Sequence, residues 1–493
     1  MVAGQHENTK AGWGRSTVLR SFAVLLVGAL AATSLTVGAG PAAAAGAGTA
    51  DAAFNTTAGT GLNSYVQAIA QQSDGKLLVG GSFFEYNGQP RSALVRLNVD
   101  GSLDSTFVQT GAGITGVVDA IAVQPDGRIV VGGSFDLYNG IARKKILRLE
   151  ATGALDLTFA QTGAGLDGAV NDLALVPGGK ILVSGYFAHY AGAARSRIAQ
   201  LTSTGALDAT FDPSSGFDQD VYTISRASNG DVWAGGPFTT YRGLPVSHVV
   251  RIPANGGAAY PAPSSAGLGA VYDIEQTPSG QVLVGGLHVM ARYSSAGVLD
   301  PSFAPVSASL PSYVFTIGQQ GDGKIVIGGR TGLTGWVGRL TSTGALDPGY
   351  PSGPRANDNV TSAVIQESGA AVIVGNFTTI DGGSFVRIAR LLPDPAPVTV
   401  PGLVSTLSLT FKRGALKLGW TAPASNGGAV ITGYQFRISK PNSKTKFRAW
   451  KSAGSLTSKV TKMVKGAKYR VQIRAVNAAG PGPVLAKGFK QRR

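Results

Sequence analysis

The sequence of 493 residues contains no cysteine and only four histidines. The absence of cysteine excludes disulfide bonds, thiol catalysis and thiolate metal sites. His189, His248 and His288 are too few and too widely spaced to predict a metal centre. There is also no Ser-His-Asp arrangement and no phosphate-binding loop. We therefore identify no catalytic residue, metal ligand or cofactor, and we expect stability to come from packing.

Charged residues are also scarce, at 14% of the chain against 43% hydrophobic residues, which excludes a disordered protein. Acidic residues are absent after Asp394, whereas 19 Lys and Arg residues follow it. From Asp51 to Pro395 there are 26 acidic and 21 basic residues. The net charge of +16 is therefore concentrated in the C-terminal part of the chain.

The N-terminal segment has the pattern of a signal peptide. Lys10, Arg15 and Arg20 precede an apolar run from Phe22 to Ala39, and small residues at 41–45 offer a cleavage site. We predict that residues 1–45 are removed, which leaves a secreted protein without a membrane span. A retained anchor is the alternative, because the run is marginally long enough to cross a bilayer.

Seven degenerate copies of one motif run from about Val66 to Leu392. In the first copy, two apolar runs flank the turn Ser73-Asp74-Gly75. Its Asp-Gly dipeptide tolerates positive φ and predicts a two-residue hairpin turn. The runs ALVRLNV and SLDSTF complete four short strands, which is the pattern of one β-propeller blade. The opening valines of the copies are Val66, Val118, Val170, Val221, Val271, Val314 and Val360.

The last strand of the motif reads Gly-x-Leu-Asp-x-x-Phe, and the seventh copy lacks it. Its aromatic residue recurs as Phe107, Phe159, Phe211, Phe303 and Tyr350, and in a degraded form as Tyr260. A matching segment, Gly48–Phe54, stands upstream of the first copy. We therefore predict an all-β fold in which residues 46–392 form a seven-bladed β-propeller closed by an N-terminal strand, so that no sheet edge stays open.

The phrases DGKLLVGGSFFEYNG and RLNVDGSLDSTF resemble the delta-60 repeats of secreted bacterial β-propeller proteins. The resemblance covers roughly residues 48–392 and is weakest in the fifth and sixth copies, which lack the Phe-x-x-Tyr-x-Gly loop. It implies a fold and carries no set of catalytic residues.

Residues 393–397 form a proline-rich linker. Beyond it, residues 398–488 resemble a fibronectin type III domain, with Trp420 at the position of the core tryptophan and Tyr469 at that of the tyrosine corner. The resemblance implies a β-sandwich with strands that include KFRAW and KYRVQIRAV. Residues 489–493 read as a basic tail.

One loop position of the repeat carries an aromatic residue in four copies. Such rings either stack on a sugar or pack against the loop. The four residues are Tyr86, Tyr138, Tyr190 and Tyr241. Variable residues beside them are candidate ligand contacts, namely Glu85, Asp136, His189 and Arg242. The repeated aspartates are either a ring of functional carboxylates or turn caps. These are Asp104, Asp156, Asp208, Asp300 and Asp347.

Alternation along the C-terminal strands turns several cations to one outer face. The predicted cationic face consists of Arg437, Lys446, Arg448, Arg470 and Arg474. Such a face attracts polyanions with a salt-dependent affinity, and we expect an anionic cell-envelope polymer or polysaccharide as the partner. A solvated surface without a specific partner is the alternative. A nucleic acid is disfavoured because few aromatic residues are interleaved with the cations.

These features predict an exported, monomeric, non-enzymatic protein that binds a ligand or protein partner and associates with the cell wall. The alternative is a secreted glycoside hydrolase or polysaccharide lyase with an accessory fibronectin type III domain. That alternative needs two carboxyl groups across one cleft, for which Glu85 and Asp136 are the candidates.

Overall fold

The computed structural model describes residues 46–107, 112–159, 165–261, 267–305, 310–395, 398–412, 415–455, 458–462 and 467–490. The predicted signal peptide and residues 491–493 lie outside these ranges. Within them the regular structure is β-strand except for α1 (Ala52–Ala58) and a 3-10 turn at residues 177–179, which confirms the all-β prediction. None of the helical segments described is long and apolar enough to cross a membrane.

In the described part of the repeat region, seven antiparallel groups of three strands follow one another, and each group is called a sheet here. Five groups are separate three-stranded sheets, whereas the second and the sixth belong to sheets of four and six strands. Their strands, sheet by sheet, are β1 (Val66–Gln71), β2 (Leu77–Gly81) and β5 (Leu94–Leu97); β6 (Ile114–Val123), β7 (Ile129–Tyr138) and β9 (Ile146–Leu149); β10 (Ala169–Val176), β11 (Lys180–Tyr186) and β14 (Ile198–Leu201); β15 (Thr223–Arg226), β16 (Val232–Gly235) and β19 (Val249–Ile252); β20 (Val271–Gln276), β21 (Val282–Gly286) and β22 (Met290–Tyr293); β23 (Tyr313–Gln319), β24 (Ile325–Thr331) and β25 (Thr334–Leu340); and β27 (Val360–Ile365), β28 (Ala371–Gly375) and β31 (Ile388–Leu391).

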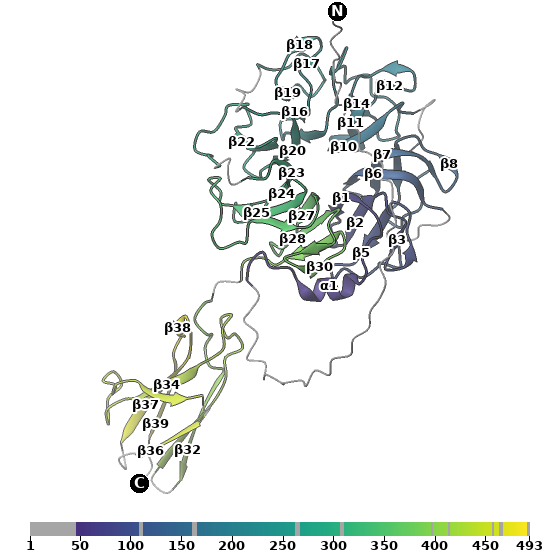
Figure 1. Ribbon diagram of the computed structural model, residues 1–493. Coiled ribbons are helices and arrows are strands. Elements are labelled where there is room, and N and C mark those ends of the chain that lie inside the picture. Colours follow the sequence, from purple (N-terminus) through teal and green to yellow (C-terminus); the bar gives the residue numbers. More distant parts are fainter. Residues whose placement is uncertain are drawn as a thin grey trace, which may run out of the picture. The chain divides into compact units, whose positions relative to one another are not determined.

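The first strand of each sheet, called here the inner strand, packs beside the first strand of the next sheet. Figure 1 shows β1, β6, β10, β20, β23 and β27 around the middle of the repeat region. Short outer hairpins follow several second strands. These are β3 (Glu85–Tyr86) with β4 (Gln89–Pro90), β12 (His189–Tyr190) with β13 (Ala193–Ala194), β17 (Thr240–Tyr241) with β18 (Leu244–Pro245), and β29 (Thr379–Ile380) with β30 (Gly383–Ser384). Two further short strands are β8 (Ile141–Ala142), which pairs with β7, and β26 (Gly353–Ala356), which pairs with β25.

The repeated Val and Gly-Gly positions explain how the sheets stack. Gly80 on β2 faces the opening valine of the next sheet, and a Cβ on Gly80 would lie 2.4 Å from Val118 Cγ1. Gly132 stands in the same relation to Val170, at 2.4 Å. Only glycine leaves room for the valine at this distance, so the repeat pairs a branched side chain with an empty position on its neighbour.

In six repeats the expected fourth short strand is reduced to a single β-bridge, and no such bridge follows β19 in the described residues of the fourth repeat, so the prediction of four short strands is wrong. In the first repeat, Leu103 bridges to Leu97 on β5. The chain then turns, because Asp104 Oδ1 accepts hydrogen bonds from Thr106 N at 2.9 Å and from Thr106 Oγ1 at 2.7 Å. Further bridges of this kind are Leu149–Leu155, Leu201–Leu207, Tyr293–Leu299 and Leu340–Leu346.

The hairpin turns also differ from the prediction of two-residue loops. Gln72 N donates to Lys76 O at 2.9 Å, which encloses a three-residue loop, and within that loop Gly75 has φ +84°. Asp74 accepts a hydrogen bond from Lys76 N at 3.1 Å instead of adopting positive φ. Three-residue loops of this kind need one left-handed residue, which the repeated glycine supplies.

The N-terminal segment lies beside β31, the third strand of the seventh sheet. Ala50 forms a β-bridge to Leu391 on β31, and α1 begins at Ala52. Gly48 N donates to Leu392 O at 2.8 Å, and Leu392 N donates to Thr49 O at 2.9 Å. The segment therefore contributes a bridge, as the other repeats do, in place of the predicted strand.

Arginines on the third strands connect neighbouring sheets, a feature that the sequence did not reveal. Arg96 Nε binds Asp104 at 2.7 Å, its guanidinium lies 4.7 Å from the Phe107 ring, and Nη1 donates to Ala151 O in the next repeat at 2.5 Å. Other repeats carry the same combination of carboxylate, aromatic ring and carbonyl at Arg148, Arg251, Arg292 and Arg390.

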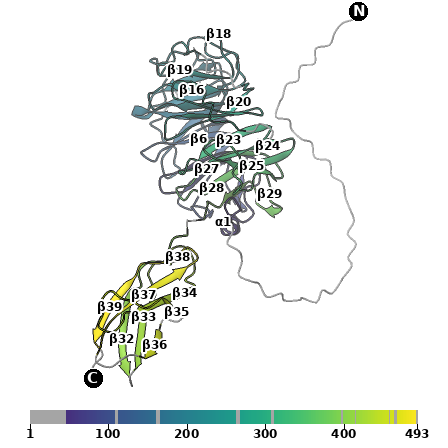
Figure 2. The same ribbon diagram turned by 90° about the vertical axis from the view of Figure 1, so that its left-hand side faces the viewer.

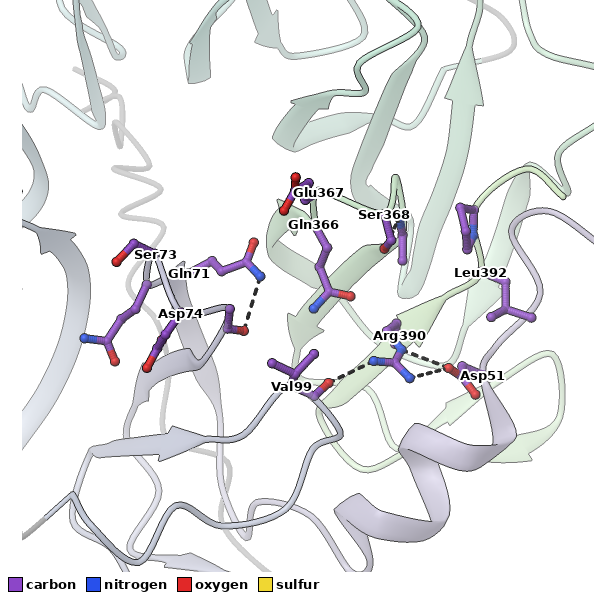
Figure 3. Close-up of a pocket in the computed structure, with 14 residues that line it drawn as sticks. Asp51, Gln71, Ser73, Asp74, Val99, Gln366, Glu367, Ser368, Arg390 and Leu392 are labelled. Carbon is purple, nitrogen blue, oxygen red and sulfur yellow. Dashed lines mark hydrogen bonds and ion pairs between the residues drawn. The ribbon is translucent and has the colours of Figure 1, made fainter. Parts of the chain in front are cut away.

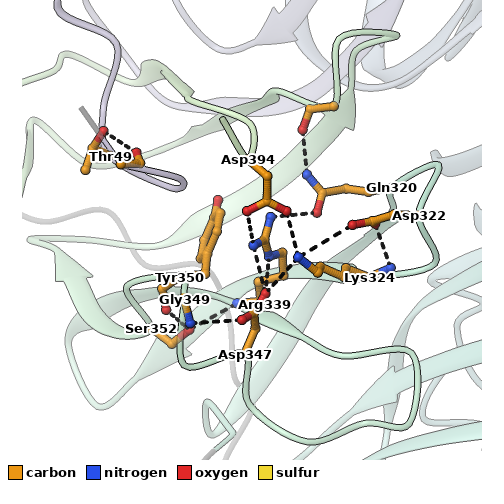
Figure 4. A network of polar contacts seen from close by, with 12 residues as sticks. Thr49, Gln320, Asp322, Lys324, Arg339, Asp347, Gly349, Tyr350, Ser352 and Asp394 are labelled. Carbon is orange, nitrogen blue, oxygen red and sulfur yellow. Dashed lines mark hydrogen bonds and ion pairs between the residues drawn. The ribbon is translucent and has the colours of Figure 1, made fainter. Parts of the chain in front are cut away.

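Arg339 is the sixth of these arginines and is fully buried (Figure 4). It pairs with Asp347 at 2.7 Å and with Asp394 at 2.6 Å. Lys324 adds a second ion pair to Asp394 at 2.7 Å. Asp394, the acidic residue of the predicted linker, is thus fixed to the repeat region.

The C-terminal region is a sandwich of two sheets (Figure 2). One sheet contains β32 (Thr406–Lys412), β33 (Ala415–Thr421) and β36 (Ser458–Lys462); the other contains β34 (Gly433–Ile438), β35 (Lys451–Gly454), β37 (Lys468–Asn477), β38 (Gly480–Pro481) and β39 (Leu485–Lys490). Trp420, Tyr434 and Tyr469 are buried in its core. The predicted strand KFRAW is wrong, since only Phe447 forms a bridge, to Ser439. The predicted domain end at 488 falls inside β39.

Candidate functional site

The four repeated tyrosines of the outer loops are buried, with at most 1% of each residue exposed. Tyr86 Oη donates to Gly101 O at 2.5 Å, and Tyr138 Oη donates to Gly153 O at 2.8 Å. Tyr190 and Tyr241 make the equivalent hydrogen bonds to Gly205 and Gly256. A sugar cannot stack on a buried ring. The packing alternative therefore accounts for these tyrosines, and we do not include them in the candidate ligand site.

The variable residues beside these tyrosines lie on four different repeats. Asp136 pairs with Lys145 at 3.0 Å, and His189 Nδ1 lies 2.8 Å from Asp167 Oδ2. Arg242 donates to Asp212 O at 2.8 Å. Among the described residues, no hydrogen bond or ion pair joins any two of Glu85, Asp136, His189 and Arg242, so the structure does not bring them together.

The repeated aspartates act in turns and ion pairs. Burial would raise the pKa of Asp104, but hydrogen bonds from Thr106, Lys76 and Arg96 outweigh it and hold the pKa well below its usual range. Asp156 is arranged in the same way with Thr158 and Arg148. In the described ranges no group of three or more His, Asp and Glu side chains is arranged to hold a metal ion.

A pocket of about 610 Å³ lies where the first and last sheets meet (Figure 3). The turns after β1 and β27 form its sides, with Ser73 and Asp74 on one and Glu367 and Ser368 on the other. Its cation, Arg390, already binds Asp51 at 2.6 Å and Val99 O at 2.8 Å. The charge of Arg390 is therefore already neutralised, and the pocket lies over a contact that joins the first and last sheets.

The inner strands carry acidic residues that the sequence analysis did not single out. Burial raises the pKa of Asp119 and of Asp172 to about 6 and that of Glu275 to about 7. Burial, followed by the charge of Glu275, raises the pKa of Asp273 well above its usual range. All four residues are half-buried, so part of each residue stays exposed although its carboxyl group is desolvated.

Two of these acids connect neighbouring inner strands. Asp172 Oδ2 accepts a hydrogen bond from Ile224 N on β15 at 2.8 Å, and Asp273 Oδ2 accepts one from Ile317 N on β23 at 2.6 Å. In the described residues, no hydrogen bond reaches the carboxylate of Glu275. Glu275 is thus the acid of this group whose charge is least compensated.

An arc of aromatic rings crosses three adjacent inner strands. Tyr222 stacks on Tyr272 with ring centroids 5.6 Å apart, and Tyr272 meets Phe315 edge-on at 5.3 Å. Tyr313 lies 5.7 Å from both Tyr272 and Phe315. All four rings are half-buried, and the Arg330 guanidinium lies 4.5 Å from the centre of Tyr313. We call these four residues the aromatic arc.

Most of this arc could have been found from the residue that follows each opening valine. In six sheets the strand register shifts across this position, which marks a β-bulge. The residue is half-buried in every repeat. In chain order it is Gln67, Asp119, Asn171, Tyr222, Tyr272, Phe315 and Thr361. The repeat thus keeps the valine constant for packing and varies the next residue.

The sandwich places two of the predicted cations on one outer face. On β34 and β37, Arg437 is opposite Gln472 and Arg474 is opposite Gln435. Arg437 Nε donates to Gln472 at 2.6 Å, and Arg474 Nη2 donates to Gln435 at 2.8 Å. Both guanidinium groups lie over Trp450, at 4.6 Å and 4.1 Å from its ring. The alternation predicted for KYRVQIRAV is confirmed by its burial pattern.

Lys446, Arg448 and Arg470 are exposed. Arg470 belongs to the same strand as Arg474, β37, whereas Lys446 and Arg448 lie in the irregular segment before β35. Trp450, which holds the two arginines, was not singled out from the sequence because KFRAW was assigned to a strand.

Comparison with known families accounts for both regions. A model described as a β-propeller domain of unknown function (DUF5122) matches residues 72–107, 124–159, 177–211 and 368–394. The fibronectin type III model matches residues 404–486. The chain contains a DUF5122 β-propeller repeat region and a fibronectin type III domain. The predicted resemblances are therefore confirmed for the propeller repeats and for the fibronectin domain.

Similar solved structures include the extracellular domain of a one component system of B. thetaiotaomicron, with 11% identity and a TM-score of 0.45 over 91% of this chain and 59% of that one. An extracellular domain of a hybrid two component system from the same organism has 13% identity and a TM-score of 0.37 over 87% of this chain and 68% of that one. The fourth fibronectin type III domain of a human protein matches 20% of this chain and 83% of its own length, at 20% identity and a TM-score of 0.18. The chain spans 59% of the length of the first of these.

Proposed function

We propose that this chain is an exported, non-enzymatic binding protein whose fibronectin type III domain attaches it to an anionic cell-envelope polymer. The observation that carries the proposal is the charge of that domain. The chain has 19 Lys and Arg residues after Asp394 and no acidic residue. No carboxylate side chain within the domain compensates these cations, so its surface attracts polyanions.

The arrangement of Arg437 and Arg474 supports a site for phosphate or carboxylate groups. Each guanidinium is held by a glutamine and by the Trp450 ring, so little side-chain entropy is lost when an anion binds. Guanidinium groups bind such anions through paired N–H donors. The exposed Lys446, Arg448 and Arg470 add long-range attraction, which salt screens.

The same proposal includes a closed, seven-bladed propeller as the second module, spanning residues 46–392. Support comes from the joint between the last and first sheets. β27 packs beside β1, and Thr361 Oγ1 on β27 donates to Val66 O at 2.7 Å. The pair Arg390–Asp51 repeats, across the two ends of the chain, the contact that Arg96 and Asp104 make within one repeat.

The hydrolase alternative gains nothing from its two candidates. Glycoside hydrolysis needs two carboxyl groups that face one substrate bond. Glu85 lies on the outer hairpin of the first sheet, whereas Asp136 lies on β7 of the second and is neutralised by Lys145 at 3.0 Å. We therefore favour binding over turnover.

The test is binding of the full mature chain to poly(glycerol phosphate) at two salt concentrations. We expect measurable affinity at low salt that falls at least about tenfold at high salt. The double variant Arg437→Gln and Arg474→Gln should lose most of the affinity. Arg91→Gln is the matched control, because the side chain of half-buried Arg91 makes one hydrogen bond within the described residues, to the neighbouring Pro90 O. Salt-independent binding, or an equal loss with the control, contradicts the proposal.

A further inference from the structure

We infer that the aromatic arc on the inner strands of the fourth to sixth sheets is a glycan site that takes a hexosamine oligosaccharide with free amino groups. This site goes beyond the attachment of the fibronectin domain and is separate from it. It combines a row of apolar rings with carboxylates on the same strands, and each part selects one feature of the ligand.

The rings supply the stacking surface. Tyr222, Tyr272 and Phe315 each follow the opening valine of three adjacent sheets. Tyr272 and Phe315 lie at β-bulges on β20 and β23, and Tyr222 lies directly before β15. Successive ring centroids lie 5.6 Å and 5.3 Å apart. They touch one another, yet each keeps part of its surface exposed. A ligand that covers the exposed part of these rings with apolar surface removes that part from water, which is favourable. Apolar C–H faces of a pyranose chain are suited to such a surface, because they can pack on rings while hydroxyl groups stay hydrated.

The carboxylates supply the charge selection. Asp273 and Glu275 lie on β20 together with Tyr272, and Asp220 lies two residues before Tyr222. Arg197 lies 3.4 Å from Asp220, so that charge is compensated. Asp273 receives a backbone N–H, whereas the described residues give Glu275 no hydrogen bond. An ammonium group beside Glu275 would provide the missing partner for a poorly hydrated carboxylate.

The surroundings argue against an anionic glycan at this site. Asp172, Asp273 and Glu275 interact through space, so a further negative charge would be repelled. The guanidinium of Arg330 already stacks on Tyr313, 4.5 Å from the ring centre. That contact also shows that a ring of the arc accepts a cation on its face. The site thus favours a cationic ligand, whereas the cationic face of the fibronectin domain favours an anionic one.

The experiment is calorimetric titration of the full mature chain at pH 7.5, where Glu275 is mostly ionised, with two probes, glucosamine hexamer and N-acetylglucosamine hexamer. The two probes share a sugar backbone and differ in the charge on nitrogen. We expect the glucosamine hexamer to bind at least about tenfold more tightly. Tyr272→Ala should weaken its binding about tenfold, and Tyr272→Phe should retain it within about threefold.

Glu275→Gln separates the charge from the stacking surface. It should reduce the preference for glucosamine over N-acetylglucosamine and leave the weak binding of the acetylated probe unchanged. Phe84→Ala and Glu367→Gln are matched controls, because Phe84 and Glu367 are exposed and lie outside the arc. Thermal unfolding checks that each variant folds, and Tyr272→Phe and Glu275→Gln are close in shape to the wild type.

Three results overturn the inference. The first is the absence of glucosamine hexamer binding, and the second is binding that neither Tyr272→Ala nor Glu275→Gln changes. Equal affinity for the two probes also contradicts it, since the ligand would then be selected without its charge. The double variant Arg437→Gln and Arg474→Gln should leave the titration unaltered, so this outcome and that of poly(glycerol phosphate) binding are independent.

Discussion

The propeller and the fibronectin type III domain use charged residues in opposite ways. In the propeller, arginines of successive repeats pair with carboxylates, lie over aromatic rings and donate to carbonyl groups of the next sheet. In the fibronectin domain the cations have no carboxylate partner in the same domain, because the chain has no acidic residue after Asp394. Two of them, Arg437 and Arg474, are held instead by glutamines and Trp450.

The difference teaches that net charge alone does not identify a binding surface. The propeller contains 21 basic residues, which is more than the 19 that follow Asp394, yet many are occupied in joining sheets. A cation becomes available to a partner when no internal carboxylate neutralises it. Removing paired and unpaired arginines should therefore affect different properties of the protein.

The strongest test of this comparison is Arg390→Ala at the joint of the propeller. The change leaves Asp51 without its ion pair at 2.6 Å, Phe54 without its stacked cation at 4.8 Å and Val99 O without a donor. We expect a loss of about 2–4 kcal/mol in the free energy of unfolding, since one partner of a partly buried network is removed.

Chemical denaturation of the full mature chain measures this loss. Arg91→Ala is the control and should change the free energy of unfolding by about 0.5 kcal/mol or less, because the Arg91 side chain makes only an exposed hydrogen bond to the adjacent Pro90 O within the described residues. Equal stability of the Arg390→Ala variant and the wild type would show that the joint does not depend on this network.

A medium effect is expected from Glu275→Gln, and its sign depends on pH. Burial raises the pKa of Glu275 to about 7. A carboxyl group whose pKa is raised on folding favours the native state at low pH, and this contribution is lost as pH rises through the folded value. The variant should therefore have a Tm about 2 °C or more above the wild type at pH 8 and a smaller difference at pH 5.

Thermal unfolding of the wild type and the Glu275→Gln variant at pH 5 and pH 8 tests this expectation, with the Glu367→Gln variant, changed at an exposed residue, as the reference. Asp156 gives the opposite dependence. Burial opposes its ionisation, but Thr158 and Arg148 outweigh this and lower its pKa, so its contribution is lost as pH falls through the acidic range. A Glu275→Gln effect that is equal at pH 5 and pH 8 would mean that the carboxyl group is not desolvated.

The sequence predicted the features that each repeat must share, because packing demands them in every copy. The valines, the Gly-Gly pairs and the turn glycines recur for that reason, and they led to the propeller repeats. The motif also predicted that Gly48–Phe54 completes the seventh copy, although the two segments are far apart in the chain. The sequence did not reveal the ion pairs of the arginines, such as that of Arg390 with Asp51, 339 positions away.

The candidate site shows a second limit of the sequence analysis. Repetition drew attention to Tyr86 and its equivalents, but a residue that recurs in the repeats is needed by the fold, and these rings are buried. Three of the four rings of the aromatic arc, among them Tyr272, occupy a position that varies between copies and is Gln67 or Asn171 elsewhere. Variation beside a constant valine was visible in the sequence, whereas the adjacency of the fourth, fifth and sixth inner strands became visible only in the structure.

The smallest effect on stability, and the one that completes the comparison, is expected from Arg474→Gln. Arg474 is half-buried, and its partners are the neutral Gln435 and Trp450, so no carboxylate is left unpaired when it is removed. Its own pKa is lowered by burial and by the nearby Arg437, which shows that the two cations repel each other. We therefore expect a change of about 0.5 kcal/mol or less in the free energy of unfolding, together with weaker binding to poly(glycerol phosphate). Denaturation and polymer binding of the same preparation give both values. A loss of stability as large as that of Arg390→Ala would mean that the arginine is structural, and the distinction between the two regions would then fail.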